Sequence, residues 1–169
     1  MKLTKTALAL LIVFAASATG YVAGYYSKAT NEEKAAHVTG IGGVFFRSKN
    51  PKELKQWYDT HLGFNSDKYG TYFEWREGSD SSHKGFTLWA PFHEKTTYFT
   101  KDMMINYRVN DLNLLLQQLK AEGINPIDTV ELTTYGKFAH IIDPEGNKIE
   151  LWQPDDTEYE KLTAGRTIY

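Results

Sequence analysis

Two side chains that could exchange a proton, His140 and Glu150, lie near the end of this chain of 169 residues. Between them, the turn-forming residues 143–147 separate two runs of strand character, which predicts a β-hairpin. If Ile142 pairs with Lys148, alternation along the strands puts the apolar side chains on one face. The other face then carries Phe138, His140, Glu150 and Trp152. A carboxylate opposite an imidazole raises the pKa of the imidazole, so we treat His140 and Glu150 as a candidate acid–base pair.

The elements that would position this pair occur twice along the chain. Residues 39–47 have strand character, and a helix capped by Asn50 follows and ends at Gly63. Residues 72–77 and 85–90 are predicted strands, and 96–100 is a shorter extended piece. The pattern restarts at 103–109, with a helix capped by Asp111 and ended by Gly123. Segment 86–91 then aligns with 149–154, so we predict two βαβββ units that share one α+β domain with pseudo-twofold symmetry.

Aromatic side chains are expected on the face of the sheet that carries His140 and Glu150. Alternation and repeat equivalence place six of them there, namely Phe45, Phe73, Trp75, Trp89, Phe138 and Trp152. Aromatic walls with few polar groups are typical of a small-molecule pocket. The alternative is that these rings pack against each other or against a second subunit. Other candidate ligand-binding residues are Arg47, Thr87, Met104, Asn106, Arg108 and Tyr135.

Composition limits the classes of function. The formal net charge of −2 and the isoelectric point near 6.2 leave no basic stripe for nucleic acid. The absence of cysteine excludes disulfides and cysteine-bound zinc. The apolar content of 41% is that of a folded globule.

The N-terminus predicts export. Lys2 and Lys5 precede the apolar segment 7–18, which ends in an Ala-x-Ala triplet, the arrangement of a secretory signal peptide. Uncharged sequence continues through Ser27, so an uncleaved membrane anchor is the alternative. We therefore expect a signal or anchor at 1–26, a linker at 27–36, the folded domain at 37–154 and a polar tail at 155–169. Either reading makes the domain extracytoplasmic, with membrane contact only through its N-terminal segment.

Several motifs resemble those of the vicinal oxygen chelate superfamily, which includes glyoxalase I, bleomycin-binding proteins and extradiol dioxygenases. They are Trp57-Tyr58, then His61-Leu62-Gly63 at the end of the first helix, and the late segment 143–150, Asp-Pro-Glu-Gly-Asn-Lys-Ile-Glu. The resemblance covers about residues 37–154. It implies a cup-shaped mixed sheet, and it is specific for the fold rather than for a reaction.

In that superfamily a metal is held by the first and last strands of each unit. The resemblance carries these positions to Gly43, Thr87, Met104 and Glu150. Glycine offers no ligand, methionine is too soft for the usual metals, and a lone threonine is a poor substitute for a carboxylate. We therefore expect no metal ligands and no cofactor, although a divalent metal stays an alternative.

The sequence leaves three functions open. The first is an exported, metal-independent protein that binds a small, planar or aromatic molecule. The second is an enzyme, a glyoxalase-like lyase or isomerase or another enzyme of that superfamily, that uses Glu150 and His140 with or without a divalent metal. The third is a protein-interaction module with a filled cup. Because open sheet edges favour pairing of units, we also expect a homodimer.

Overall fold

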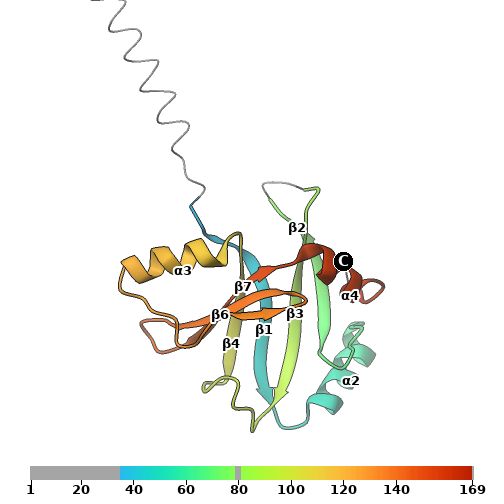
Figure 1. Ribbon diagram of the computed structural model, residues 1–169. Coiled ribbons are helices and arrows are strands. Elements are labelled where there is room, and N and C mark those ends of the chain that lie inside the picture. Colours follow the sequence, from blue (N-terminus) through green and yellow to red (C-terminus); the bar gives the residue numbers. More distant parts are fainter. Residues whose placement is uncertain (1–34, 79–80, 169) are drawn as a thin grey trace, which may run out of the picture. The chain divides into compact units, whose positions relative to one another are not determined.

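A mixed eight-stranded sheet with three helices makes up the part of the chain that this computed structural model describes, residues 35–78 and 81–168 (Figure 1). The strand order is β5-β6-β7-β4-β1-β3-β2-β8. The strands are β1 (Val38–Ser48), β2 (Thr71–Arg76), β3 (Lys84–His93), β4 (Met103–Val109), β5 (Glu131–Thr133), β6 (Gly136–Ile142), β7 (Lys148–Pro154) and β8 (Thr167–Ile168). The helices are α2 (Pro51–Leu62), α3 (Leu112–Ala121) and α4 (Asp156–Thr163). The predicted α+β class is confirmed.

Local signals set the ends of α2 and α3. The Asn50 side chain accepts a hydrogen bond from the Glu53 backbone at 3.3 Å, and Gly63 ends α2 in the left-handed conformation, with φ of 70°. Asp111 accepts from the Leu114 backbone at 3.0 Å at the start of α3. Leu112 is fully buried, and α3 packs its leucines on Ala139 and Leu151 of the sheet.

The predicted hairpin register is confirmed. β6 and β7 pair antiparallel with Ile142 opposite Lys148, and His140 therefore lies opposite Glu150. The turn between them is tied by Asp143, whose carboxylate accepts from the backbone of Glu145 and Asn147. Gly146 adopts φ of 76° there, which a residue with a side chain rarely does.

The two halves of the sheet meet where β1 and β4 run antiparallel, with Gly43 opposite Asn106. In the first half β1 pairs parallel with β3, and Gly43 lies beside Leu88. In the second half β4 pairs parallel with β7, and Asn106 lies beside Glu150. Leu88 and Glu150 are therefore equivalent positions of the two halves.

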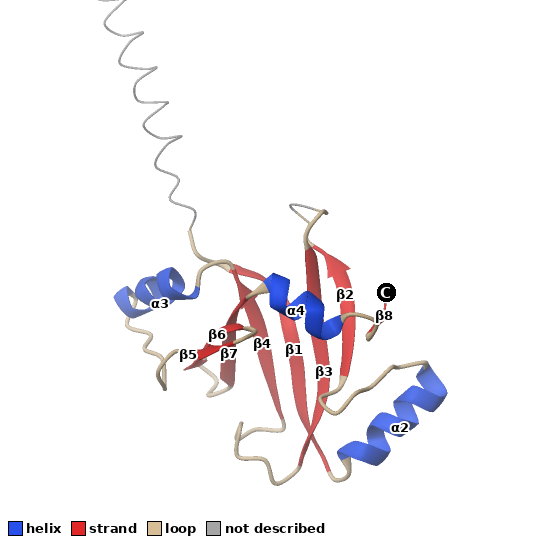
Figure 2. Ribbon diagram, turned by 45° about the vertical axis from the view of Figure 1, so that its right-hand side comes forward, coloured by secondary structure: helices blue, strands red, loops and turns tan. Residues whose placement is uncertain are grey.

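The structure corrects three expectations. The first unit has two strands after its helix, not three, and the C-terminal β8 lies on the outer side of β2. Residues 96–100 are a loop and not an extended piece. Residues 155–169 contain α4 and β8, and α4 lies across β1 and β3 in Figure 2. Tyr159 of α4 packs with Tyr72, Phe86 and Trp152.

The predicted signal peptide or anchor at 1–26 and most of the linker at 27–36 lie outside the described residues. Within the described ranges, no helix is both long enough and apolar enough to cross a bilayer.

Candidate functional site

Glu150 is the centre of the polar site. Its side chain is only 2% exposed, yet it accepts hydrogen bonds at both carboxylate oxygens. Asn106 Nδ2 donates to Oε1 at 2.7 Å, His140 Nε2 lies 2.9 Å from Oε2, and the hydroxyl of Tyr98 donates to the same Oε2. Adjacent strands β4, β6 and β7 position three of these residues, and the loop after β3 brings Tyr98. A buried carboxylate is stable only with such partners.

His140 links Glu150 to a second carboxylate. Its Nδ1 lies 2.6 Å from Asp128 Oδ2, and its backbone N–H donates to Asp128 Oδ1 at 3.1 Å. The His140 side chain is 7% exposed and that of Asp128 is 40% exposed. Only the protonated imidazole donates from both ring nitrogens, so the two carboxylates fit the charged form.

The pKa values of the site follow from these contacts. Burial by itself would lower the pKa of His140, but the hydrogen bond and charge of Glu150, helped by Asp128, raise it above the ordinary 6.5. Burial would raise the pKa of Glu150, but hydrogen bonds from His140, Asn106 and Tyr98 lower it below its ordinary value. Burial and the charge of Glu150 raise the pKa of Tyr98, whose hydroxyl therefore stays protonated.

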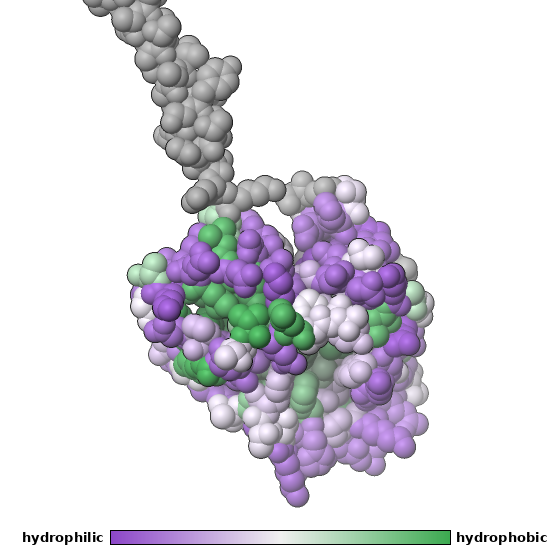
Figure 3. Space-filling view, viewed as in Figure 1, coloured by the Kyte–Doolittle hydropathy of each residue, from purple (hydrophilic) through white to green (hydrophobic). Residues whose placement is uncertain are grey.

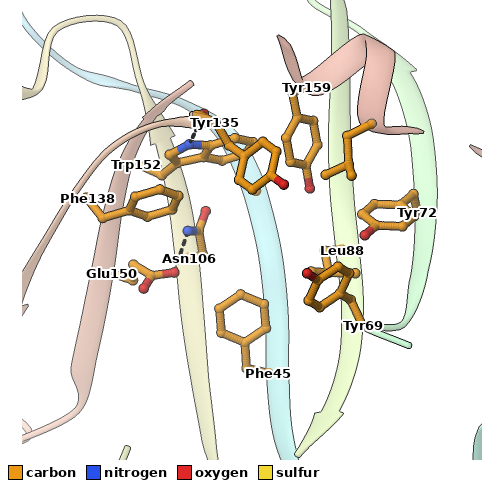
Figure 4. Close-up of a pocket in the computed structure, with 12 residues that line it drawn as sticks. Phe45, Tyr69, Tyr72, Leu88, Asn106, Tyr135, Phe138, Glu150, Trp152 and Tyr159 are labelled. Atoms are coloured by element: carbon orange, nitrogen blue, oxygen red, sulfur yellow. Dashed lines mark hydrogen bonds between the residues drawn. The ribbon is translucent and has the colours of Figure 1, made fainter. Parts of the chain in front are cut away.

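Glu150 and Asn106 form part of the wall of an aromatic cavity of about 190 Å³, shown in Figure 4. A neighbouring cavity of about 460 Å³ shares Phe45, Tyr69, Leu88, Tyr135, Phe138 and Glu150 with it. We call the two together the cup. The remaining lining residues are Gly42, Tyr72, Asn106, Trp152, Tyr159 and Leu162 in the smaller cavity and Ala90, Phe92, Tyr98, Glu131 and Thr133 in the larger one.

The cup is apolar apart from a few polar groups. Figure 4 shows the hydroxyls of Tyr69, Tyr72, Tyr135 and Tyr159 turned toward the space between them. Phe138 stacks on Trp152 with ring centroids 5.8 Å apart, and the indole N–H of Trp152 donates to the Tyr135 carbonyl at 3.0 Å. The space-filling view has a hollow near its centre, bordered by hydrophobic and intermediate side chains, with hydrophilic side chains farther out (Figure 3). This composition is that of a small-molecule pocket.

Gly42 makes room for the polar wall. A Cβ at this position would lie 2.1 Å from Asn106 Oδ1 and 2.7 Å from the Trp152 ring, so no larger residue fits without movement. Asn106 is 2% exposed, and its Oδ1 has no hydrogen-bond partner in the described ranges.

The structure brings part of the predicted site together. Phe45, Asn106, Tyr135, Phe138, Glu150 and Trp152 all line the cup, and His140 reaches Glu150 from behind it.

Phe73, Trp75, Thr87 and Trp89 were predicted on the cup face, and this prediction was wrong because they lie on the other face of the sheet. Trp89 packs on Tyr58 of α2 at 4.6 Å between ring centroids, and Phe64 contacts both Phe73 and Trp89. The Thr87 hydroxyl accepts from the Trp75 indole at 3.0 Å and donates to the Ile41 carbonyl at 2.6 Å.

The physical reason is a repeat alignment shifted by one residue. Because Leu88, and not Thr87, is equivalent to Glu150, the cup face of β3 carries residues 86, 88, 90 and 92. β2 follows, since Tyr72 pairs with Leu88 and lines the cup.

Three further candidates are engaged elsewhere. Met104 is 1% exposed in a core cluster with Phe45 and Phe99. The strand position opposite Gly43, which was predicted to hold Met104, holds Asn106. The Arg47 guanidinium donates to backbone carbonyls of the loop that carries Tyr98, including that of Phe99 at 2.6 Å. Arg108 is buried and pairs with Asp156 at 3.0 Å, which holds the start of α4.

Sequence reasoning missed Tyr98, Asp128 and the cover provided by α4. Tyr98 and Asp128 come from loops without periodicity, and no local signal identifies them. For α4 a signal existed, because Asp155 accepts from the Glu158 backbone as an N-cap and Tyr159 and Leu162 share one face.

The residues present do not fit the metal that this type of cup implies. The four equivalent strand positions hold Gly43, Leu88, Asn106 and Glu150. Only Glu150 is a good ligand for a hard or borderline metal, and three protein donors already occupy it. Across the described ranges, no group of three or more histidine or acidic side chains is arranged to hold a metal ion.

Comparison with known proteins agrees with this architecture. Residues 34–151 match the model of the Glyoxalase/Bleomycin resistance protein/Dioxygenase superfamily. No curated protein matches the sequence. Among solved structures, Streptomyces coelicolor methylmalonyl-CoA epimerase in complex with 2-nitronate-propionyl-CoA is 11% identical, with a TM-score of 0.53 over 70% of this chain and 99% of that one.

Two further similar structures are the Mycobacterium tuberculosis methylmalonyl-CoA epimerase and a superfamily member from Vibrio splendidus 12B01. The first is 19% identical over 76% of this chain and 93% of that one, with a TM-score of 0.47. The second is 15% identical over 67% of this chain and 97% of that one, with a TM-score of 0.43. At these identities the likeness concerns the fold.

Proposed function

We propose, for a chain that belongs to the Glyoxalase/Bleomycin resistance protein/Dioxygenase superfamily, that the cup binds a small, largely apolar or aromatic molecule without a metal ion. The observation that carries this proposal is the cup itself. Its aromatic walls surround the Glu150 carboxylate, whose oxygens both accept hydrogen bonds, and the Asn106 amide oxygen, which has no hydrogen-bond partner among the described residues. Pockets of this composition bind ligands by apolar burial and orient them with few polar contacts. The complex of the Streptomyces coelicolor epimerase with 2-nitronate-propionyl-CoA supports the binding of a small molecule by this fold.

The state of Glu150 favours binding over proton transfer. A general base works best when its pKa lies near the working pH. Three donors lower the pKa of Glu150 below its ordinary value, so the carboxylate is a weak base. Its two oxygens are also occupied, which leaves little room for a substrate proton.

Calorimetric titration of the full-length protein with naphthylmethanol tests this proposal. We expect saturable binding that weakens about tenfold or more in Leu88→Trp, because the larger ring fills the wall that both cavities share. Thr87→Val is the matched control, since Thr87 lies one residue away and points to the other face of the sheet. Equal loss in both variants, or no binding by the wild type, would overturn the proposal.

The second candidate is a glyoxalase-like lyase or isomerase. It is favoured by the line of contacts from the half-exposed Asp128 through His140 to Glu150 at the cup wall, along which a proton can move. A panel of carbonyl compounds in deuterated water separates the enzyme from the binding protein. NMR measures whether the protein catalyses exchange of deuterium into the carbon atoms next to each carbonyl group. Exchange that the wild type catalyses and Glu150→Gln does not would favour the enzyme.

We also propose export of the domain and its association as a homodimer. Export rests on Lys2, Lys5 and the apolar segment 7–18. Cell fractionation and sequencing of the mature N-terminus test export, and an intact N-terminus in the cytoplasmic fraction would contradict export.

Light scattering tests the homodimer, and a monomer mass at all protein concentrations would contradict the homodimer.

A further inference from the structure

One polar atom at the cup wall has no hydrogen-bond partner in the part of the chain that the structure describes. Asn106 Oδ1 is buried and receives no hydrogen bond from the described residues, although Asn106 lines the smaller cavity. A buried acceptor without a donor costs free energy, so native structures satisfy most such atoms. An unpaired acceptor beside a cavity is therefore a site where a ligand gains more than apolar contact.

The orientation of the Asn106 amide is fixed by its neighbour. The Glu150 carboxylate accepts at Oε1 from Asn106 Nδ2 at 2.7 Å, and turning the amide around would place two oxygen acceptors against each other. Figure 4 shows the amide nitrogen directed at Glu150 and the amide oxygen pointing away from it. The free atom is thus an acceptor, and it calls for a donor.

The charge of the cup adds a second restriction. Glu150 and Glu131 are the charged residues among those that line the two cavities, and no lysine, arginine or histidine lines either one. Behind the wall, His140 lies between the carboxylates of Asp128 and Glu150, so these three groups together are negative even when the imidazole carries a proton. Aromatic faces also attract cations and not anions.

We propose that the molecule held in the cup is uncharged or cationic and donates an N–H or O–H hydrogen bond to Asn106 Oδ1. This inference rests on the proposed binding function and deepens it, because it names the chemical class of the ligand. The ligand combines an aromatic or apolar body with an alcohol, phenol or amine donor.

Four naphthalene probes of similar size test the inference in calorimetric titrations of the full-length protein. They are naphthylmethanol, its methyl ether, naphthylmethylamine as the ammonium ion, and naphthoate. We expect the alcohol and the ammonium ion to bind about tenfold or more tightly than the ether, because only they donate to Asn106. Naphthoate should bind weakest, since Glu150 and Glu131 repel it.

The variant Asn106→Leu removes the acceptor and keeps a side chain of similar size. Because it also frees Glu150 Oε1, which lines the same cavity, it is combined with Glu150→Leu so that no new acceptor replaces the lost one. The preference for alcohol over ether should then fall to near unity, whereas Thr87→Val on the other face should keep it. Because the readout is a ratio between probes, a general loss of affinity does not imitate the result. If this combined variant does not fold, the comparison of alcohol with ether in the wild type decides alone.

The outcomes separate this inference from the function on which it rests. Equal binding of alcohol and ether, or preference for naphthoate, overturns the donor inference while the binding function stands. Failure of all four probes overturns both.

Discussion

Where β1 and β3 pair, Leu88 lies beside Gly43 and lines the cup. Where β4 and β7 pair in the equivalent way, Asn106 and Glu150 line it. Around Leu88 the neighbours are aromatic and apolar, and Leu88 itself packs on the buried clusters that contain Phe45 and Tyr72. Around Glu150 they are polar, and every carboxylate oxygen is bonded. The same backbone pairing therefore supports opposite chemistry.

The fold supplies equivalent positions in the two halves, and the side chains at those positions decide what each half does. The first half contributes shape and apolar area to the cup. The second half contributes its acceptor and its charge. An internal comparison of the halves is thus a built-in control for every substitution at the site.

The largest effect is expected when the second half is given the residue of the first. Glu150→Leu leaves the donors of Asn106, His140 and Tyr98 buried without an acceptor, so the free energy of unfolding should fall by about 3–5 kcal/mol. Urea unfolding measures it. Glu145→Leu in the exposed turn is the control and should change stability by about 0.5 kcal/mol or less.

The reverse exchange, Leu88→Glu, sharpens the same comparison. The new carboxylate has no equivalent donors, so NMR titration should give it a pKa above its ordinary value, in contrast to the lowered pKa of Glu150. A lowered pKa at position 88 would show that the two halves do not differ as described.

A smaller loss of stability is expected at the seat of Asn106. In Gly42→Ala the new Cβ meets Asn106 Oδ1 and the Trp152 ring, so either side chain must move, at a cost of about 1–3 kcal/mol. Gly78→Ala is the control, because a Cβ at Gly78 has nothing within 4 Å. Equal stability of the two variants in urea unfolding would contradict the packing of Asn106 over Gly42.

The charge of the second half predicts a pH dependence. Because the folded pKa of His140 is raised, its stabilisation is complete below the unfolded value of 6.5 and is lost as the pH rises through the folded pKa. Each unit of raised pKa corresponds to about 1.4 kcal/mol. Unfolding free energies measured over this range should therefore decline with pH in the wild type and stay nearly constant in His140→Gln.

NMR titration gives the site-specific measurement for the same pair. In Glu150→Gln the pKa of His140 should fall, because the largest contribution that raises it comes from Glu150. The other four histidines serve as internal controls. An unchanged pKa of His140 in this variant would contradict the coupling.

Local signals were enough to predict the hairpin and the two helices. The segregation of side chains about Ile142 and Lys148 fixes one register, and Asn50 and Asp111 cap helices through bonds to residues three positions on. The pairing of His140 with Glu150 follows from the same register. These features depend on residues close together in the sequence, so one sequence is enough to predict them.

The cup face of β3 was not predictable in the same way. It depends on a parallel pairing of β1 with β3, across 45 positions from Gly43 to Leu88, and β1 has two register irregularities between Val38 and Gly43. The similar sequences 86–91 and 149–154 suggested an alignment that was one residue wrong, and in a strand one residue reverses the face. Tyr98 depends on a loop held by Arg47, a contact no periodicity indicates.

The smallest effect is expected from removal of metal. Of the four strand positions, Gly43 and Leu88 offer no ligand, Asn106 is held by Glu150, and the Glu150 oxygens are taken by protein donors. Treatment of the full-length protein with EDTA should therefore leave both the melting temperature and the affinity for naphthylmethanol unchanged, and elemental analysis should find no stoichiometric metal. The contradicting result is zinc, nickel, iron or manganese at one equivalent that EDTA removes together with binding of naphthylmethanol. The polar half would then have to rearrange to free the Glu150 carboxylate. The two halves would then differ as a metal site differs from an apolar wall.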